Sequence, residues 1–101
     1  MTYKTIAGAD RPIRLFVDDD MFPSIESGVF DQARNTANTA GVEHVCVLPD
    51  CHSGYGAPIG SVVVSADRVI PGPVGFDIGC GMAVYLTSAH ASELRDRLKR
   101  R

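Results

Sequence analysis

Residues 49–81 constrain the fold of this chain more than any other region, because they hold most of its glycine and proline. Seven of the ten glycines and four of the six prolines fall in these 33 residues. Glycine adopts backbone conformations that other residues avoid, and proline removes a backbone donor, so a stretch rich in both forms turns and loops. We therefore expect a loop-rich region built around a single longer strand, near residues 59–66.

The rest of the chain carries the signals of further strands. Residues 13–17 alternate between apolar and polar side chains, and residues 42–48 are rich in β-branched side chains and end before Pro49, so each segment predicts a strand. The apolar segment 82–87 predicts another.

Two helices are expected beside these strands. Residues 24–40 predict the first, since apolar side chains recur there at helical spacing, with Ser24 as the N-cap and Gly41 as the C-terminal stop. Residues 89–101 predict the second, and the sequence stops inside it without a capping residue. The fold class is therefore α+β, a mixed sheet with flanking helices in one unit over residues 1–101, and a truncated chain or a split gene is expected.

Composition narrows the class of protein. Apolar residues make up 45% of the chain and charged residues 22%, which is typical of a globular protein and not of a disordered one. The sequence has neither an apolar run long enough to span a membrane nor a signal-peptide pattern, so we expect a cytoplasmic location and no membrane. Its three cysteines, Cys46, Cys51 and Cys80, are irregularly spaced, which indicates free thiols or metal ligands.

Charge is concentrated in two places. The acidic run 18–20 can hold a cation, although a solvated turn is the favoured interpretation. Residues 95–101 carry five basic side chains and one acidic one, which leaves a net charge of −6 for residues 1–94. This basic tail is a candidate phosphate-binding patch, and a solvated helix end is the favoured alternative.

The first motif with chemical potential covers residues 49–60, PDCHSGYGAPIG. Asp50 and His52 are two residues apart, so in an extended backbone their side chains leave from the same face. A carboxylate beside an imidazole can orient its tautomer, share a metal or move a proton. A turn in which Asp50 caps backbone N–H groups and His52 only packs explains the same residues equally well.

The second motif covers residues 71–82, PGPVGFDIGCGM. Asp77 and Cys80 are three residues apart in a glycine-rich turn, a spacing that lets a carboxylate and a thiolate converge on one ion or on two adjacent ions. This mixed pair leaves Mn²⁺, Zn²⁺ and Fe²⁺ open. The alternative is that Cys80 is a buried free cysteine.

Together, the two motifs resemble the RtcB-type RNA ligases, whose N-terminal region carries a PD-x-H-x-G-x-G-x-PIG stretch followed by a P-G-x-VGFDI-x-CG stretch. The resemblance implies an N-terminal portion of a ligase that joins an RNA 3′-phosphate or 2′,3′-cyclic phosphate end to a 5′-hydroxyl end, in tRNA splicing or RNA repair. It implies GTP and two Mn²⁺ ions as cofactors, and a histidine–GMP intermediate. By motif match, Asp77 and Cys80 correspond to metal ligands, while Asp50 and His52 belong to the active-site region.

Members of that family are several times longer than this chain. The only histidines here are His44, His52 and His90, and the resemblance places the nucleophilic histidine, the remaining metal-binding histidines and most of the GTP pocket in sequence beyond these residues. We therefore expect the isolated chain to lack full activity, and a complementary chain is one source of the missing histidines. The alternatives are a non-catalytic metal- or RNA-binding module derived from the family, and a thiol-based redox or zinc protein, which no paired CxxC spacing supports.

Overall fold

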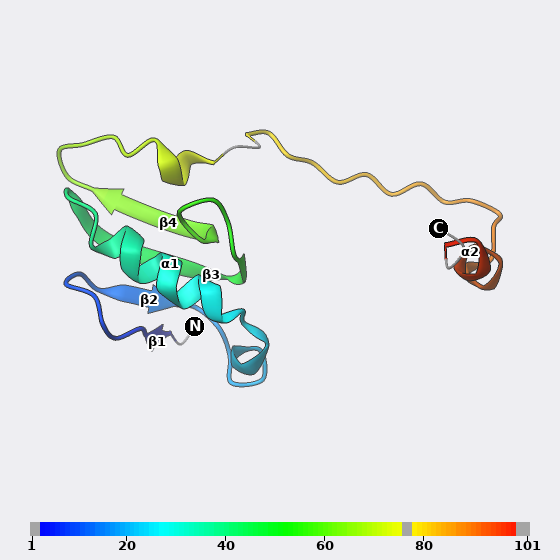
Figure 1. Cartoon of the computed structure of the whole chain (residues 1–101), viewed down its shortest axis with the longest axis horizontal. Coiled ribbons are helices and arrows are strands. Elements are labelled where there is room, and N and C mark those ends of the chain that lie inside the picture. Colours follow the sequence, from blue (N-terminus) through cyan, green and yellow to red (C-terminus); the bar gives the residue numbers. More distant parts are fainter. Residues whose placement is uncertain (1–2, 76–77, 99–101) are drawn as a thin grey trace.

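A four-stranded mixed sheet with one long helix on one face forms the body of the molecule (Figure 1). The structure is a computed structural model that describes residues 3–75 and 78–98. The strands lie side by side in sequence order: β1 (Lys4–Thr5), β2 (Ile13–Leu15), β3 (Val42–His52) and β4 (Ile59–Ser65). Strand β2 runs parallel to β3, and the two outer pairs are antiparallel. This arrangement confirms the α+β class.

Helix α1 (Ser27–Ala37) connects the two parallel strands and closes the core. Its Val29, Ala33 and Ala37 recur every four residues and are buried, as the periodicity predicts. They pack in one cluster with side chains that point inward from the central strands, including Ile13, Leu15, Val45 and Val47, all with no exposed surface. Burial of these aliphatic side chains is the main force that holds helix and sheet together.

The start of α1 corrects the sequence prediction. Ser24 does not cap the helix, because it lies in a separate 3-10 turn, η1 (Phe22–Ser24), where its hydroxyl donates to the Met21 carbonyl oxygen at 2.7 Å. Proline is favoured in the first positions of a helical turn, so Pro23 begins this short turn. The residue before α1 is Glu26. The predicted end of the helix was also wrong, since α1 ends at Ala37 with Asn38 as its C-cap, and Gly41, with a φ of +90°, lies in the turn that leads into β3.

Strand β3 extends further than predicted, through Pro49 to His52. The register of β3 against β4 shifts between Val47 and His52, and pairing resumes at His52 opposite Ile59. Pro49 lies inside this irregular interval, where its missing N–H interrupts no regular ladder. The predicted end at Pro49 was therefore wrong, whereas the strand predicted near 59–66 is confirmed as β4.

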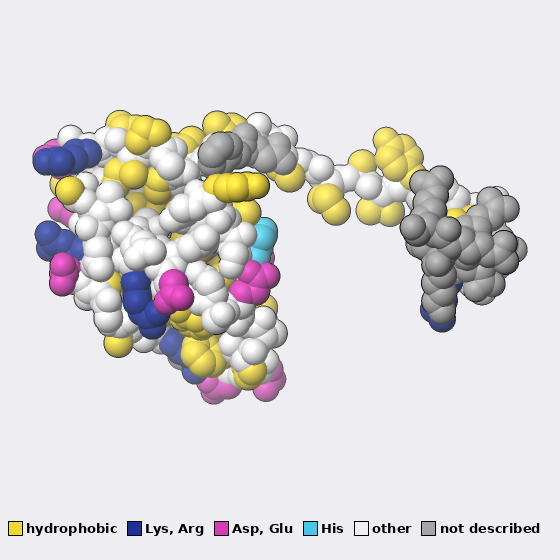
Figure 2. All heavy atoms as spheres, viewed as in Figure 1, with side chains coloured by type: hydrophobic (Ala, Val, Ile, Leu, Met, Phe, Trp, Pro, Cys, Tyr) yellow, Lys and Arg dark blue, Asp and Glu magenta, His cyan; other side chains and the backbone are white. Residues whose placement is uncertain are grey.

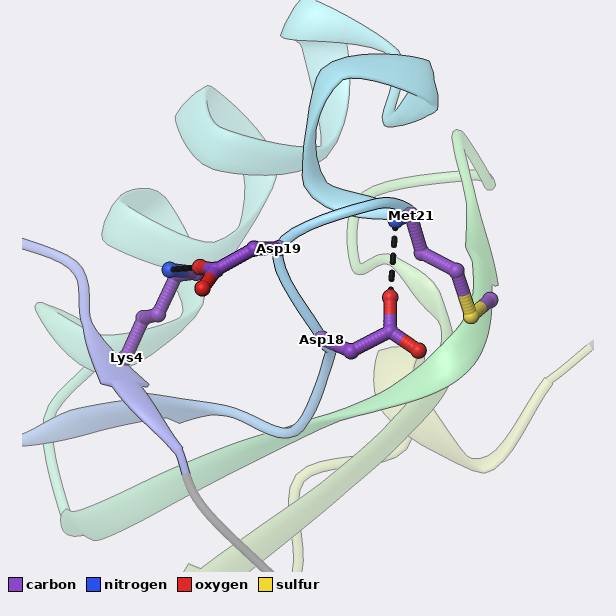
Figure 3. Close-up of polar contacts among 4 residues, drawn as sticks. All are labelled: Lys4, Asp18, Asp19 and Met21. Atoms are coloured by element: carbon purple, nitrogen blue, oxygen red, sulfur yellow. Dashed lines mark hydrogen bonds and ion pairs between the residues drawn. The ribbon is translucent and has the colours of Figure 1, made fainter.

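The acidic run 18–20 forms an exposed turn, which confirms the favoured interpretation. Figure 3 shows that one carboxylate oxygen of Asp18 accepts a hydrogen bond from the Met21 backbone N–H at 2.8 Å. The Asp19 carboxylate pairs with the Lys4 ammonium on β1, and this hydrogen bond lowers the pKa of Asp19. These carboxylates therefore tie the turn to its own backbone and to β1.

The predicted strand at residues 82–87 is wrong. Within the described part of the chain these residues join no sheet and belong to an extended arm, residues 81–90, that leads away from the body to helix α2 (Ala91–Leu98) (Figure 1). Apolar side chains stand out along the arm in Figure 2, and Met82, Val84, Tyr85 and Leu86 are 86–97% exposed. A β-rich segment becomes a strand only beside a hydrogen-bonding neighbour, which the described residues do not give it.

Helix α2 confirms a helix in the second predicted region, although residues 99–101 lie outside the described residues. The two-residue strand β1 and the 3-10 turn η2 (Gly72–Val74) were not predicted, because elements this short carry no periodic signal. Neither described helix is long and apolar enough to cross a membrane.

Candidate functional site

The end of strand β3 places the first motif at the edge of the core. Asp50 and His52 are exposed, while Cys51 between them is partly buried and packs against the core cluster. The alternation expected from an extended backbone is therefore present. Burial raises the pKa of the Cys51 thiol, which makes Cys51 a packing residue and a poor source of thiolate near neutral pH.

The His52 ring is oriented by the backbone of Asp50. Its Nδ1 lies 3.1 Å from the Asp50 carbonyl oxygen. A carbonyl oxygen only accepts hydrogen bonds, so Nδ1 is the donor in this contact, and in a neutral ring the lone pair is then on Nε2, where it can bind a metal. The spacing of the two residues thus predicted their proximity, but the contact is made through the Asp50 carbonyl.

The Asp50 carboxylate lies close to another residue of the first motif, Gly60. A Cβ at Gly60 would be 3.0 Å from Asp50 Oδ1 and 3.2 Å from the Cys51 Cα, and Gly60 has a φ of +78°. Both the crowding and the backbone conformation disfavour any residue other than glycine at this position. Gly60 therefore lets the start of β4 approach the end of β3 closely.

A cavity of about 600 Å³ joins the two motifs. His52 and Tyr55 line it from the first motif and Cys80 from the second, and residues 57–61 and 72–75 complete its wall. Three of these wall residues are glycines, so much backbone is within reach of a bound molecule. Backbone N–H groups in glycine-rich loops are suited to phosphate oxygens.

The cavity brings together two of the four predicted site residues. Cys80 is exposed, and with His52 it offers a thiol and an imidazole, both ordinary ligands of divalent transition metals. Asp50 is near the cavity but does not line it. Asp77 lies outside the described residues, and among the residues that are described no three His, Cys, Asp or Glu side chains gather closely enough to hold a metal. The donors present fit part of a metal site.

The loop after His52 is fastened to helix α1 by residues that the sequence analysis missed. The Gln32 amide nitrogen donates to the Gly54 carbonyl oxygen at 2.7 Å, and the Gly54 N–H donates to the Gln32 amide oxygen at 2.9 Å. The Ser53 N–H donates to a carboxylate oxygen of Glu26 at 3.0 Å. The helical spacing alone places Gln32 beside the apolar face of the helix, because Gln32 lies one turn before the buried Thr36.

The fold and the cavity define a small α+β unit with two glycine-rich motifs that line one cavity. In a comparison with known protein families, residues 32–101 match the family described as tRNA-splicing ligase RtcB. The chain belongs to the RtcB family, which confirms the resemblance seen in its two motifs.

Individual relatives agree with this assignment. The chain is 42% identical over 92 residues to the tRNA-splicing ligase RtcB of Nanoarchaeum equitans, an alignment that covers 86% of this chain and 19% of the relative. It is 37% identical over 93 residues to the tRNA-splicing ligase RtcB of Thermococcus kodakarensis, covering 87% and 19%. It is 33% identical over 99 residues to the RNA-splicing ligase RtcB of Escherichia coli K12, covering 97% and 24%. The chain thus spans about a fifth to a quarter of the length of these curated relatives.

Proposed function

We propose that this chain supplies part of the active site of an RNA ligase that joins a 3′-phosphate end to a 5′-hydroxyl end. The observation that carries the proposal is the cavity that both His52 and Cys80, one from each glycine-rich motif, line. Relatives named as RNA-splicing and tRNA-splicing ligases extend over both motifs. RNA with these ends is therefore the proposed partner, and tRNA splicing or RNA repair the proposed setting.

The finer part of the proposal concerns the cofactors, GTP and Mn²⁺. A histidine nitrogen attacks the α-phosphorus of GTP and pyrophosphate leaves; the resulting GMP group passes to the RNA 3′-phosphate. The 5′-hydroxyl oxygen then attacks that phosphorus, its proton goes to a base, and GMP leaves as the phosphodiester forms. A 2′,3′-cyclic end must first be opened by water to the 3′-phosphate. None of His44, His52 and His90 is assigned as the nucleophile.

The residues of this chain have narrower roles in that reaction. Cys80 and Asp77 are proposed as metal ligands, and bound Mn²⁺ would neutralise phosphate charge during in-line displacement. His52, with Nδ1 held by the Asp50 carbonyl, keeps Nε2 available as a further ligand or as a proton acceptor. The glycine-rich wall lets backbone N–H groups approach phosphate oxygens.

Metal binding tests the site directly. Free Mn²⁺ is titrated by electron paramagnetic resonance against the wild-type chain, Cys80→Ser and the matched control Cys46→Ser, whose thiol lies on β3 away from the cavity wall. Loss of a soft anionic ligand should weaken binding by about tenfold or more in Cys80→Ser and leave Cys46→Ser unchanged. Equal binding by all three proteins would remove Cys80 from the metal site.

The reaction itself is tested with the natural product that contains these residues, identified by its intact mass in the source cells. We expect it to join RNA with 3′-phosphate and 5′-hydroxyl ends only with GTP and Mn²⁺ present. Metal and RNA binding without joining would favour the alternative, a non-catalytic module derived from the family.

A further inference from the structure

In the loop that follows His52, both backbone polar groups of Gly54 bond to one side chain, that of Gln32. Gln32 accepts from the Gly54 N–H at 2.9 Å and donates to the Gly54 carbonyl oxygen at 2.7 Å. Both distances are those of well-formed hydrogen bonds. Two bonds from one amide fix the orientation of the Gly54 backbone as well as its distance from the helix, which a single bond does not do.

Two neighbouring positions at the start of α1 support the same loop. The Glu26 carboxylate accepts the Ser53 N–H at 3.0 Å. Ser53, through its hydroxyl and its backbone N–H, lowers the pKa of Glu26, so this carboxylate stays ionised near neutral pH. Ser53 also packs closely against Gly28, because a Cβ at Gly28 would be 2.7 Å from the Ser53 hydroxyl oxygen. The loop therefore sits against the first two turns of α1.

The position of this loop matters for the candidate site. Ser53 and Gly54 directly follow His52, whose ring lines the cavity and whose Nδ1 contacts the Asp50 carbonyl. The loop begins and ends at one strand pair, because His52, before the loop, is paired with Ile59, after it. If the backbone of Ser53 and Gly54 moved, the backbone and ring of the adjacent His52 would therefore be displaced first.

We propose that Gln32 is a positioning residue of this site: with Glu26, it fixes Ser53 and Gly54 on helix α1 and thereby holds the His52 ring in the cavity that Cys80 also lines. The inference rests on the proposed function for what the cavity binds. Gln32 is only half-buried and is not a member of the core cluster. Its loss should therefore change the site more than the body.

The test uses the 101-residue chain as wild type, as Gln32→Ala and as Asn35→Ala. Asn35 is an exposed amide on the same helix with no side-chain hydrogen bond to the described residues, so its replacement controls for helix propensity and for loss of an amide. Amide hydrogen exchange reports on the Gly54 N–H, and imidazole ¹⁵N shifts report on the tautomer of His52. Thermal melting shows whether each variant keeps the fold.

In wild type and Asn35→Ala we expect a protected Gly54 amide and the Nδ1–H tautomer of His52. In Gln32→Ala the Gly54 amide should exchange about tenfold faster or more, because its acceptor is gone. The ring should lose its preference for Nδ1–H, and melting should remain cooperative. If Gln32→Ala does not fold, Gln32→Met replaces it, since that side chain keeps a similar length but has no amide to accept from the Gly54 N–H or to donate to the Gly54 carbonyl.

Unchanged Gly54 exchange, or a His52 tautomer that ignores Gln32, overturns the proposal. Neither readout needs a metal, so the proposal is judged separately from the proposed function. Mn²⁺ is added last, and broadening of the His52 and Cys80 signals reports on the metal site. Absence of this broadening in the wild-type chain would contradict the proposed metal site. The role of Gln32 would still be decided by the exchange and tautomer measurements.

Discussion

The two glycine-rich motifs have the same kind of composition but very different surroundings. Residues 49–60 are held by the pairing of β3 with β4 and by the contacts of Glu26 and Gln32 with the loop. Residues 71–82 follow the end of β4, make one turn at η2 and lead into the exposed arm (Figure 1). Glycine content thus predicts that both are loops, while side-chain contacts outside the motifs decide which loop is fixed.

The same contrast appears in their reactive side chains. The cysteine of the first motif, Cys51, packs against the core, and burial raises the pKa of its thiol. The cysteine of the second motif, Cys80, is exposed and lines the cavity. A thiol that packs contributes to stability, whereas an accessible thiol can bind a metal. The cavity therefore combines a half held by strand pairing and loop contacts, which carries His52, with a more exposed half, which carries Cys80.

The largest expected effect comes from replacing one leucine in the body and one in the arm and comparing the two losses of stability. Leu15→Ala removes a side chain with no exposed surface from the core, and we expect a loss of about 2–5 kcal/mol in the free energy of unfolding. Leu86→Ala removes the same atoms from a side chain that is 97% exposed, so the change should stay within about 0.5 kcal/mol. Urea unfolding measures both.

A substantial loss in Leu86→Ala would show that the arm is packed in solution. The second half of the site would then be as closely packed as the first, and residues 82–87 would again be candidates for a strand.

A smaller effect compares one glycine from each motif. Gly60 and Gly79 both have positive φ angles, +78° and +89°, so alanine at either position costs about 1–2 kcal/mol in backbone strain. Only Gly60 is also crowded, by Asp50 Oδ1 at 3.0 Å and the Cys51 Cα at 3.2 Å from an added Cβ, whereas nothing lies within 4 Å at Gly79. Urea unfolding should therefore show a larger loss for Gly60→Ala than for Gly79→Ala.

Equal losses would mean that the β3–β4 end relaxes without cost. A larger loss for Gly79→Ala would reverse the comparison and make the second motif the more tightly constrained of the two.

The sequence predicted those parts of the fold whose signals are periodic. The spacing of Val29, Ala33 and Ala37 predicted the helix and its buried face, although Ser24 and Gly41 misplaced its two ends. Residues 82–87 failed because β-propensity describes a side chain's preference for a sheet but cannot supply the neighbouring strand. Pro49 misled for a related reason: a proline ends a strand only where its N–H would be needed, and the irregular register of β3 removes that need.

The candidate site was predictable to a similar extent. Spacing placed Asp50 and His52 on one face, and the family motifs pointed to Cys80, which shares the cavity with His52. The spacing places Gln32 beside the apolar face of α1, but the contacts of Gln32 and Glu26 were not predictable, because their partners are backbone groups more than 20 residues away and a backbone contact leaves no mark on the partner's residue type. The prediction that Asp77 is a ligand lies outside the described residues.

The smallest expected effect concerns the charge that helps to hold the first motif. Ser53 lowers the pKa of Glu26 below its ordinary value of 4.5. A carboxylate with a depressed pKa in the folded state contributes stability that is complete above its unfolded pKa and is lost as the pH falls through its folded pKa. Glu26→Gln should therefore be slightly less stable than wild type near neutral pH, and the gap should close on acidification below about pH 4.5. Urea midpoints of both proteins across this range measure the gap, and the Gly54 exchange rate shows whether it arises in the loop. A gap that is constant with pH would mean that Glu26 acts on the loop through the shape of its side chain and not through its charge.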